Sequence, residues 1–316
     1  MNAQTAPAAQ SRRVVRRAAE AGPRFGRICS RLLTSMGFVA LVSLAPSDAA
    51  LAATAPNLGS TSTYAVVSST FSNANTAPQT ILNGTPAQPV LCYTTLSSTL
   101  PVTITGTTVI NCDPLTVGLD QNAASANLIA QANAPTCTVL SATPLEAVII
   151  GTNPAGTFPP GCYTSAGAMN ITANGIVTLS GAGVYVFRPG GALNTGANSH
   201  VVLAGGACAS DVFWAPVAAT NLGANSGPSF ITPTFQGNIL DAAGINIGHF
   251  ANLTGRALAF GGTVNTDANT ITVPTCTTVV VSGVAGPGIP ALSEWAMLML
   301  AALLALAGFA AMRRPR

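Results

Sequence analysis

Side chains able to act as acids, bases or nucleophiles are sparse in the central part of this 316-residue chain. Residues 53–285 contain two histidines, His200 and His249, and no lysine. The acids of that stretch are Asp113, Asp120, Glu146, Asp211, Asp241 and Asp267. They lack the spacing of a calcium loop, and the sequence has no G-x-S-x-G, H-E-x-x-H or phosphate-loop motif. We therefore expect a protein that is not an enzyme and that holds no metal or cofactor.

The positive charge of the chain is concentrated at its two ends. Only 7% of all residues are charged, and Arg188 and Arg256 are the only basic residues besides histidine between residues 53 and 285. Two arginines against six acids give that stretch a net charge of −4. Binding of phosphate backbones needs clustered Lys and Arg, so the sequence predicts no nucleic-acid partner.

Cysteine usage indicates an oxidising compartment. Six of the seven cysteines lie in the central part, an even number that suits disulfides, and they lack the C-x-x-C spacing of metal sites. Many connectivities are open to six cysteines. We favour local pairs and one long-range pair, namely Cys92–Cys112, Cys137–Cys162 and Cys208–Cys276.

The N-terminus has the order of a secretory signal peptide. An arginine-rich stretch is followed by an apolar run, Leu32–Ala45, and then by small residues up to Ala53. We expect residues 1–52 to be removed during export across the inner membrane. A membrane anchor is the alternative, but the apolar run is short for one.

The C-terminus combines a short motif, an apolar run and a basic end. The motif is Ile289, Pro290, Ala291, Leu292, Ser293, Glu294 and Trp295. Residues 296–312 are apolar and just long enough for a transmembrane helix, and three arginines follow. This tail, residues 289–316, resembles the IPTL-type sorting signal, although Ala291 stands where that signal usually has Thr. The resemblance implies processing by an exosortase-like enzyme and delivery to the cell surface or the exterior. A plain single-span anchor is the alternative.

The central part repeats itself from about residue 169 onward. Short segments that begin with asparagine recur at intervals of 24, 27, 25 and 19 residues, starting at Asn170, Asn194, Asn221, Asn246 and Asn265. Each is followed by a short β-branched or aromatic run and by Gly, Asn or Pro. Repeats of this length predict a β-solenoid, in which stacked coils bury a shared interior. A β-sandwich is the alternative, but it does not explain the recurring asparagines.

One segment departs from this pattern. Residues 115–134 are rich in Ala, Asn, Gln and Leu, and Leu119, Ala123, Ala126 and Ala130 share one face of a helix. We expect one helix along the solenoid, with that face buried.

The same stretch resembles the ice-binding-protein-like (antifreeze) family. The resemblance is carried by ordered motifs that include Leu58-Gly59-Ser60, Pro159–Tyr163, Val184–Phe187, Asp211–Trp214 and Phe235–Leu240. It implies an all-β dominated domain over residues 53–285, namely a discontinuous three-faced β-solenoid with one long helix alongside. A departure lies at residues 83–114, where the family usually has a Gly-rich stretch and this chain has an insert flanked by Cys92 and Cys112.

The resemblance also implies a function at a flat, uncharged face. Some members carry T-A/G-x-T/N steps there, and threonine suits ice because it is stiff and both donates and accepts hydrogen bonds. The candidate ice-binding residues are Thr105, Thr108, Thr172, Asn174, Thr195, Asn198, Asn225, Asn252, Thr266 and Asn269. We expect them to form one outward sheet that adsorbs to an ice crystal. The alternative is a structural surface, adhesin or biofilm-matrix protein on the same fold, whose partners would be matrix components.

Overall fold

The computed structural model describes residues 53–74, 78–97, 101–134, 137–225 and 234–276. The expected signal peptide, the sorting motif and the expected transmembrane helix at 296–312 lie outside these residues. Within the described ranges, the structure contains no helix with the length and apolar character that a membrane span requires.

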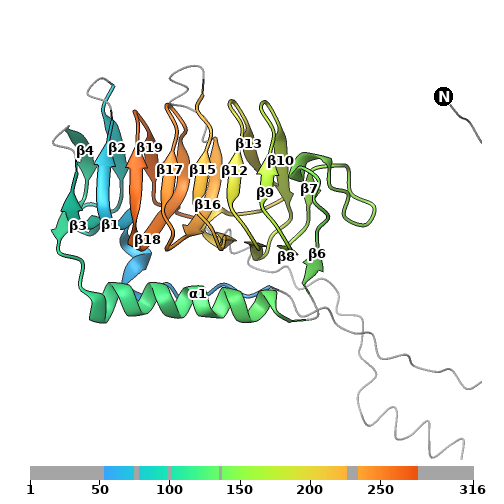
Figure 1. The fold of residues 1–316 in the computed structure, drawn as a ribbon, viewed down its shortest axis with the longest axis horizontal. Coiled ribbons are helices and arrows are strands. Elements are labelled where there is room, and N and C mark those ends of the chain that lie inside the picture. The colour runs from blue at the N-terminus through green and yellow to red at the C-terminus, as the bar shows by residue number, and fades with distance from the viewer. Residues whose placement is uncertain (1–52, 75–77, 98–100, 135–136, 226–233, 277–316) are drawn as a thin grey trace, which may run out of the picture. The chain divides into compact units, whose positions relative to one another are not determined.

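Parallel β-strands dominate the described part, and one α-helix accompanies them (Figure 1). The N-terminal strands are β1 (Val66–Asn73), β2 (Thr80–Asn83), β3 (Pro89–Leu96), β4 (Val102–Thr105) and β5 (Thr107–Ile110). A π-helical turn, Pro114–Gly118, leads into α1 (Leu119–Ala132). The strands after the helix are β6 (Thr138–Val139), β7 (Thr157–Phe158), β8 (Gly161–Ser165), β9 (Met169–Ile171), β10 (Ile176–Ser180), β11 (Tyr185–Pro189), β12 (Leu193–Thr195), β13 (His200–Ala204), β14 (Val212–Trp214), β15 (Thr220–Leu222), β16 (Phe235–Leu240), β17 (Ile245–Ile247), β18 (Leu253–Thr266) and β19 (Thr270–Thr272). Short 3₁₀ helices occupy Gly59–Thr63, Leu145–Ala147 and Ala209–Asp211.

The strands stack in parallel register into a curled sheet of 16 strands and a second sheet of three. We distinguish three rows of strands. The helix row contains β6, β8, β11, β14, β16, the start of β18, the start of β1, β3 and β5. The asparagine row contains β9, β12, β15, β17, the end of β18 and the end of β1. The third row contains β7, β10 and β13 and, further along, β19, β2 and β4.

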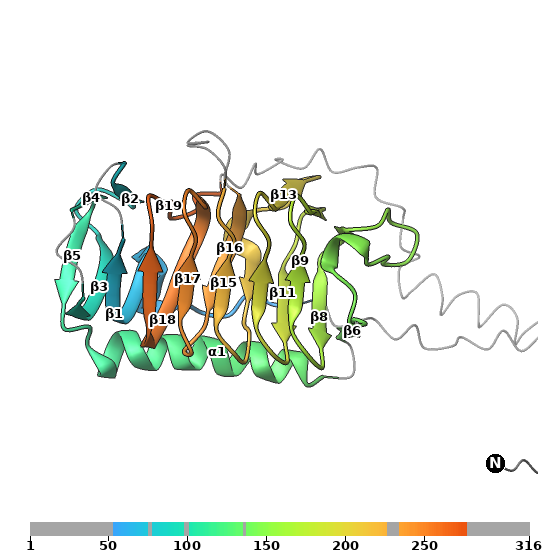
Figure 2. The ribbon, with the colours of Figure 1, turned by 45° about the horizontal axis from the view of Figure 1, so that its top comes forward.

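The order of the strands in space differs from their order in the chain. The N-terminal strand β1 pairs with β18, and β2 pairs with β19, so residues 66–83 lie beside residues 253–272. Parallel neighbours need a long connection between them. Helix α1 provides one, because it runs along the body from the β3–β5 end to the β6–β8 end (Figures 1 and 2).

The interior is filled by inward side chains of all three rows. An aromatic stack runs through successive coils, with ring centroids 5.1 Å apart between Tyr163 and Phe187 and 4.2 Å apart between Phe187 and Trp214. All three rings are buried. Burial raises the pKa of the neighbouring Tyr185 to about 12, so its hydroxyl stays protonated and donates to the carbonyl of Gly181 at 2.7 Å.

The expected helix is present, but the expected buried face is wrong. The structure buries Gln121, Ala124 and Leu128 against the helix row, whereas Leu119 is 56% exposed. Ala123, Ala126 and Ala130 are also exposed. Counting apolar residues misled the prediction because the buried face includes a polar residue, Gln121, whose side-chain oxygen accepts a hydrogen bond from the Phe260 N–H at 3.0 Å.

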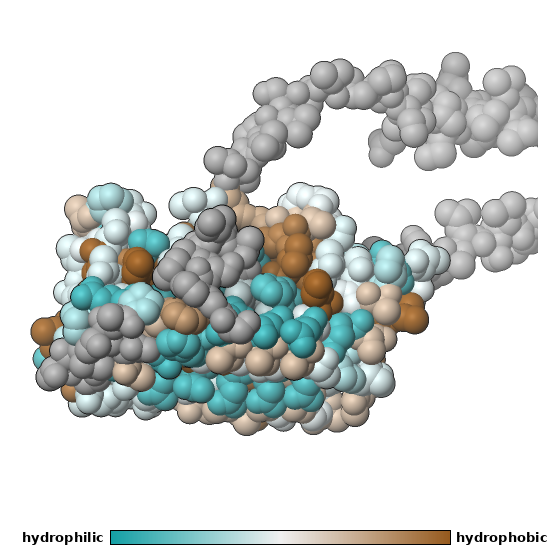
Figure 3. Space-filling model, turned by 90° about the horizontal axis from the view of Figure 1, so that it is seen from above, coloured by the Kyte–Doolittle hydropathy of each residue, from teal (hydrophilic) through white to brown (hydrophobic). Residues whose placement is uncertain are grey.

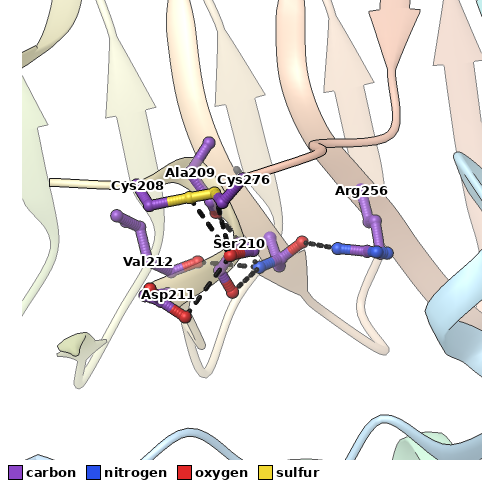
Figure 4. The surroundings of a disulfide bond; sticks show 8 residues. Cys208, Ala209, Ser210, Asp211, Val212, Arg256 and Cys276 are labelled. Carbon is purple, nitrogen blue, oxygen red and sulfur yellow. Dashed lines mark hydrogen bonds between the residues drawn. A yellow bond between two sulfur atoms is a disulfide. The ribbon is translucent and has the colours of Figure 1, made fainter. Parts of the chain in front are cut away.

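Three disulfides join the cysteines in the pairing that we favoured. Cys92–Cys112 closes the insert between β3 and α1, and Cys137–Cys162 ties the segment after α1 to β8. Cys208–Cys276 joins the chain before β14 to the chain beyond β19, as Figure 4 shows.

Candidate functional surface

Asparagines occupy equivalent positions on successive strands of the asparagine row. Each is paired in register with the next, over β9, β12, β15, β17 and β18. These residues, which we call the asparagine ladder, are Asn170, Asn194, Asn221, Asn246 and Asn265. Asn194 is half-buried and the other four are exposed. Ser72 of β1 continues the line beyond Asn265.

The alternation of side chains along each strand explains why the asparagines face outward. In β9 and β17 the asparagine stands between two buried apolar residues, Met169 and Ile171 in one strand, Ile245 and Ile247 in the other. Successive side chains of a strand point to opposite faces. Because the apolar neighbours face the interior, the asparagine side chain between them faces outward.

Side-chain hydrogen bonds run along the ladder. The Asn194 amide donates to the side-chain oxygen of Asn170 at 3.1 Å, and the Asn221 amide donates to that of Asn194 at 3.1 Å. These bonds hold the three amides in one orientation. Because an asparagine amide carries two N–H groups and two lone pairs, each keeps capacity for a partner outside the protein.

Glycines let neighbouring coils approach closely beside the ladder. A Cβ atom on Gly196 would lie 2.3 Å from the backbone nitrogen of Ala173. A Cβ atom on Gly223 would lie 2.5 Å from the carbonyl carbon of Gly196. At these two positions the backbones of neighbouring coils are therefore in direct contact beside the ladder.

Charged groups lie at the margins of this surface. At one end, Glu146 accepts hydrogen bonds from the backbone N–H of Thr172, at 3.0 Å, and from its hydroxyl. At the other end, His249 Nδ1 lies 2.9 Å from an oxygen of Asp267. The residues of the asparagine row itself, in β9, β12, β15, β17 and the end of β18, include no ionisable side chain.

A buried carboxyl group lies behind the surface. Asp241 is 1% exposed, and it accepts from the Thr220 hydroxyl at 2.7 Å and from the Ala243 N–H at 2.9 Å. Burial raises its pKa, while these hydrogen bonds act in the opposite direction. The group ties β15 to the turn before β17 and so supports the ladder from within.

Four of the residues selected from the sequence flank the ladder. Thr172 is exposed directly after β9. Asn174 and Asn198 have positive φ angles of 60° and 56°, which asparagine tolerates better than most residues. Backbone hydrogen bonds place Asn174, Asn198 and Asn225 in successive coils at the corner that follows the asparagine row.

The expectation that all ten selected residues form one outward sheet is wrong. Thr266, Asn252 and Asn269 are buried, at 1%, 6% and 1% exposure. Asn269 donates from its amide to the carbonyls of Gly248 and Ala251, so its role is to close a turn.

The remaining three selected residues also lie away from the flank. Thr195 occupies an inward position of β12, in register with the buried Ile171, and its hydroxyl accepts from the Gly223 N–H at 2.9 Å. Thr105 and Thr108 lie on β4 and β5, at one end of the third row and of the helix row. The outward ladder itself was missed, although its signal was the regular spacing that predicted the repeat.

The other two rows are less suited to present an ordered surface. Helix α1 packs against the helix row, where Val67, Val186 and Leu258 share a buried cluster with Ala124 and Leu128 of the helix. In the third row, Ile176 and Val202 are 55% and 43% exposed. Seen from above, hydrophilic residues form bands along one side of the body and apolar residues gather in patches on the other (Figure 3).

No group of three or more His, Cys, Asp or Glu side chains that could hold a metal ion occurs in the part of the chain that the structure describes. The chemistry of the ladder is accordingly that of neutral amides and backbone. It can form hydrogen bonds with a flat, uncharged partner.

Stacked parallel strands with an uncharged outward row define a β-solenoid-like domain that presents a surface. The family model described as Ice-binding-like matches residues 52–272, and the chain belongs to that family. Residues 287–314 match the IPTL-CTERM motif, in agreement with the resemblance found in the sequence.

Curated relatives match part of the chain. An ice-binding protein of Flavobacterium frigoris (strain PS1) is 35% identical over 124 residues, which are 39% of this chain and 42% of that protein. Ice-binding protein 1 of Shewanella frigidimarina (strain NCIMB 400) is 33% identical over 121 residues, which are 37% of this chain and 13% of that protein. The matches thus span less than half the length of these two relatives.

Solved structures match over a longer stretch. The crystal structure of an ice-binding protein from an Antarctic biological consortium has a TM-score of 0.58 at 26% identity, and covers 71% of this chain and 93% of that chain. The structure of an ice-binding protein from the ascomycete Antarctomyces psychrotrophicus has a TM-score of 0.54 at 27% identity, and covers 71% of this chain and all of the other.

Proposed function

We propose that this protein adsorbs to ice crystals through the asparagine ladder. The observation that carries the proposal is the register of the five asparagines, which places outward amides on neighbouring strands of one row. Neighbouring strands repeat at about 4.7–4.9 Å. Such an array offers regularly spaced donors and acceptors to the water oxygens of a crystal face.

Preorganisation supports the proposal. A surface that must order its side chains on binding loses part of the binding free energy to entropy. The bonds from Asn194 to Asn170 and from Asn221 to Asn194 order three amides in advance. Ice carries no net charge, so the absence of ionisable side chains from the asparagine row avoids desolvating charge. Thr172, Asn174, Asn198 and Asn225, which flank the ladder, complete the proposed contact surface.

The finer description of the fold is part of the proposal. We infer that the three rows are the faces of one discontinuous three-faced β-solenoid, in which residues 66–110 add coils beyond β18 and β19. The pairing of β1 with β18 and of β2 with β19 supports it.

We also propose that the protein is exported and held at, or released from, the cell surface. The IPTL-CTERM match at residues 287–314 supports this route, as do the three disulfides. On this proposal residues 1–52 are a signal peptide, residues 296–312 span the membrane before processing, and an exosortase-like enzyme acts on the tail.

Thermal hysteresis and inhibition of ice recrystallisation test the function. The exported protein should show both activities at concentrations where a control protein of the same net charge shows neither. Activity no greater than that of the control would refute ice binding, and would favour the adhesin or matrix function on the same fold.

A further inference from the structure

The body has an open edge at the end formed by the insert that distinguishes this chain from its family pattern. There β4 pairs with β2, and β5 pairs with β3. Among the described residues, no strand pairs with the other side of β4 or of β5. This edge is the left end of the body in Figures 1 and 2.

The backbone of β5 shows which groups face outward. The N–H groups of Thr107 and Asn111 donate to the carbonyls of Gln88 and Tyr93, toward the β3 side. Because backbone groups alternate sides along a strand, the N–H and C=O groups of Thr108 and Ile110 point away from β3. They form the hydrogen-bonding part of the open edge.

Strands β4 and β5 carry no charged residue and no proline, two of the features that usually prevent strand pairing between molecules. Natural edge strands carry charged residues, prolines or bulges. Residues 102–110 read V-T-I-T-G-T-T-V-I, and residues 53–112 contain no Asp, Glu, Lys, Arg or His. Ile110 of β5 and Leu96 of β3 are 62% and 45% exposed. The edge is therefore β-prone, uncharged and partly apolar.

The opposite end of the asparagine row is capped. Glu146 accepts from the backbone N–H of Thr172, a donor that would otherwise bond to one more coil. Around it, Leu140, Leu145 and Val148 are buried. Head-to-tail stacking would need this end, so the cap disfavours an open filament. An edge that cannot stack on the opposite end can still pair with a copy of itself.

We propose that the β4–β5 edge is the interface at which two copies of this protein pair, with their edge strands antiparallel about a twofold axis. A strand edge presents both donors and acceptors, so it is complementary to itself in an isologous contact. The absence of charge means that two identical edges meet without like-charge repulsion. The pairing closes the β4–β5 edges of both copies and leaves the capped ends of the two asparagine rows outward, which favours a dimer over an open filament.

Substitutions at Thr108 and Ile110 test whether the protein associates through the β4–β5 edge rather than through another surface. Thr108→Pro removes an outward N–H and keeps the bonds to β3, since proline is tolerated where the N–H faces solvent. Thr108→Ala is the matched control, because it keeps that N–H. Ile110→Lys places a charge on the same edge, and Val139→Lys places one on an exposed residue, 74% accessible, of β6 near the opposite end.

Sedimentation velocity of the exported protein over a wide range of concentrations gives the readout. We expect a dimer for the wild type, Thr108→Ala and Val139→Lys. For Thr108→Pro and Ile110→Lys we expect the dissociation constant to rise by roughly tenfold or more, because a twofold interface contains each substituted residue twice. A monomeric wild type, or a dimer that Thr108→Pro and Ile110→Lys leave as stable as Thr108→Ala does, would overturn the proposal. If the proline variant does not fold, the comparison of Ile110→Lys with Val139→Lys decides.

Discussion

The side-chain amide of Asn194 on β12 donates to the side-chain oxygen of Asn170 on β9 at 3.1 Å, and the two residues are partners in the strand register. The same side chain accepts from Asn221 of the next coil. One asparagine thus links three coils at the surface. These hydrogen bonds order the amides while leaving them at the surface. The ordering of the surface array is therefore distinct from the packing of the apolar interior.

Close approach of the coils beside this ladder predicts a steric requirement at Gly223. A Cβ atom there would lie 2.5 Å from backbone atoms of Gly196, so Gly223→Ala must push two coils apart. We expect a loss of about 1–3 kcal/mol in the free energy of unfolding, as for overpacking of an interior. Gly167→Ala is the matched control, because a Cβ at Gly167 meets no atom within 4 Å. Urea unfolding measures both, and equal stabilities would refute the steric account.

Arg256 fastens the N-terminal segment to the body through hydrogen bonds to a backbone carbonyl and to a side-chain amide. Its guanidinium donates to the Ser62 carbonyl at 2.6 and 2.9 Å and to the Asn238 side-chain oxygen at 2.7 Å, and burial lowers its pKa to about 10. Figure 4 shows Arg256 in the surroundings of the Cys208–Cys276 disulfide. We expect Arg256→Met to lower the free energy of unfolding by about 2–4 kcal/mol, because the buried Asn238 oxygen and the partly buried Ser62 carbonyl lose their donor. Chemical denaturation measures this free energy. A variant as stable as the wild type would show that the desolvation cost of the buried guanidinium is as large as the contribution of its hydrogen bonds.

The long-range disulfide should contribute more to stability than the local one. Cys208–Cys276 closes a separation of 68 residues, whereas Cys92–Cys112 closes one of 20. In the chain-entropy model this difference corresponds to about 1 kcal/mol. We expect the C208S/C276S protein to be less stable than the C92S/C112S protein by about that amount in urea unfolding. The reverse order would mean that folded-state contacts, rather than loop closure, dominate.

Asp120 gives stability a dependence on acid pH. The Ser60 hydroxyl and N–H donate to one of its oxygens at 2.6 and 2.7 Å, and these bonds lower its pKa. A carboxyl whose folded pKa is depressed stabilises the protein above its unfolded pKa, and this contribution is lost as the pH falls through the folded value. Asp120→Asn should therefore be less stable than the wild type at neutral pH. The gap should close below the unfolded pKa of about 3.8, and a gap that persists at low pH would contradict this cause.

The sequence could predict the repeat because coil geometry demands the same residue types at each turn. It could not separate the two uses of asparagine. Asn170 is exposed at the centre of a strand, and Asn174 occupies a left-handed turn, yet both recur at the same intervals. They are distinguished only by which residues of each coil lie in the strand and point outward, and this depends on which apolar neighbours are buried. The same limit explains the error on α1, where Gln121 is buried and Leu119 is exposed.

The measurement that tests ice adsorption through the ladder most directly is the thermal hysteresis of Asn221→Lys beside that of Asn122→Lys. Asn221 is exposed in the middle of the ladder, and Asn122 is exposed on α1, so the two substitutions add the same charge to different surfaces. We predict that Asn221→Lys loses most of the hysteresis while Asn122→Lys retains it, at unchanged stability. Equal activity of the two variants would contradict the assignment of ice binding to the asparagine ladder.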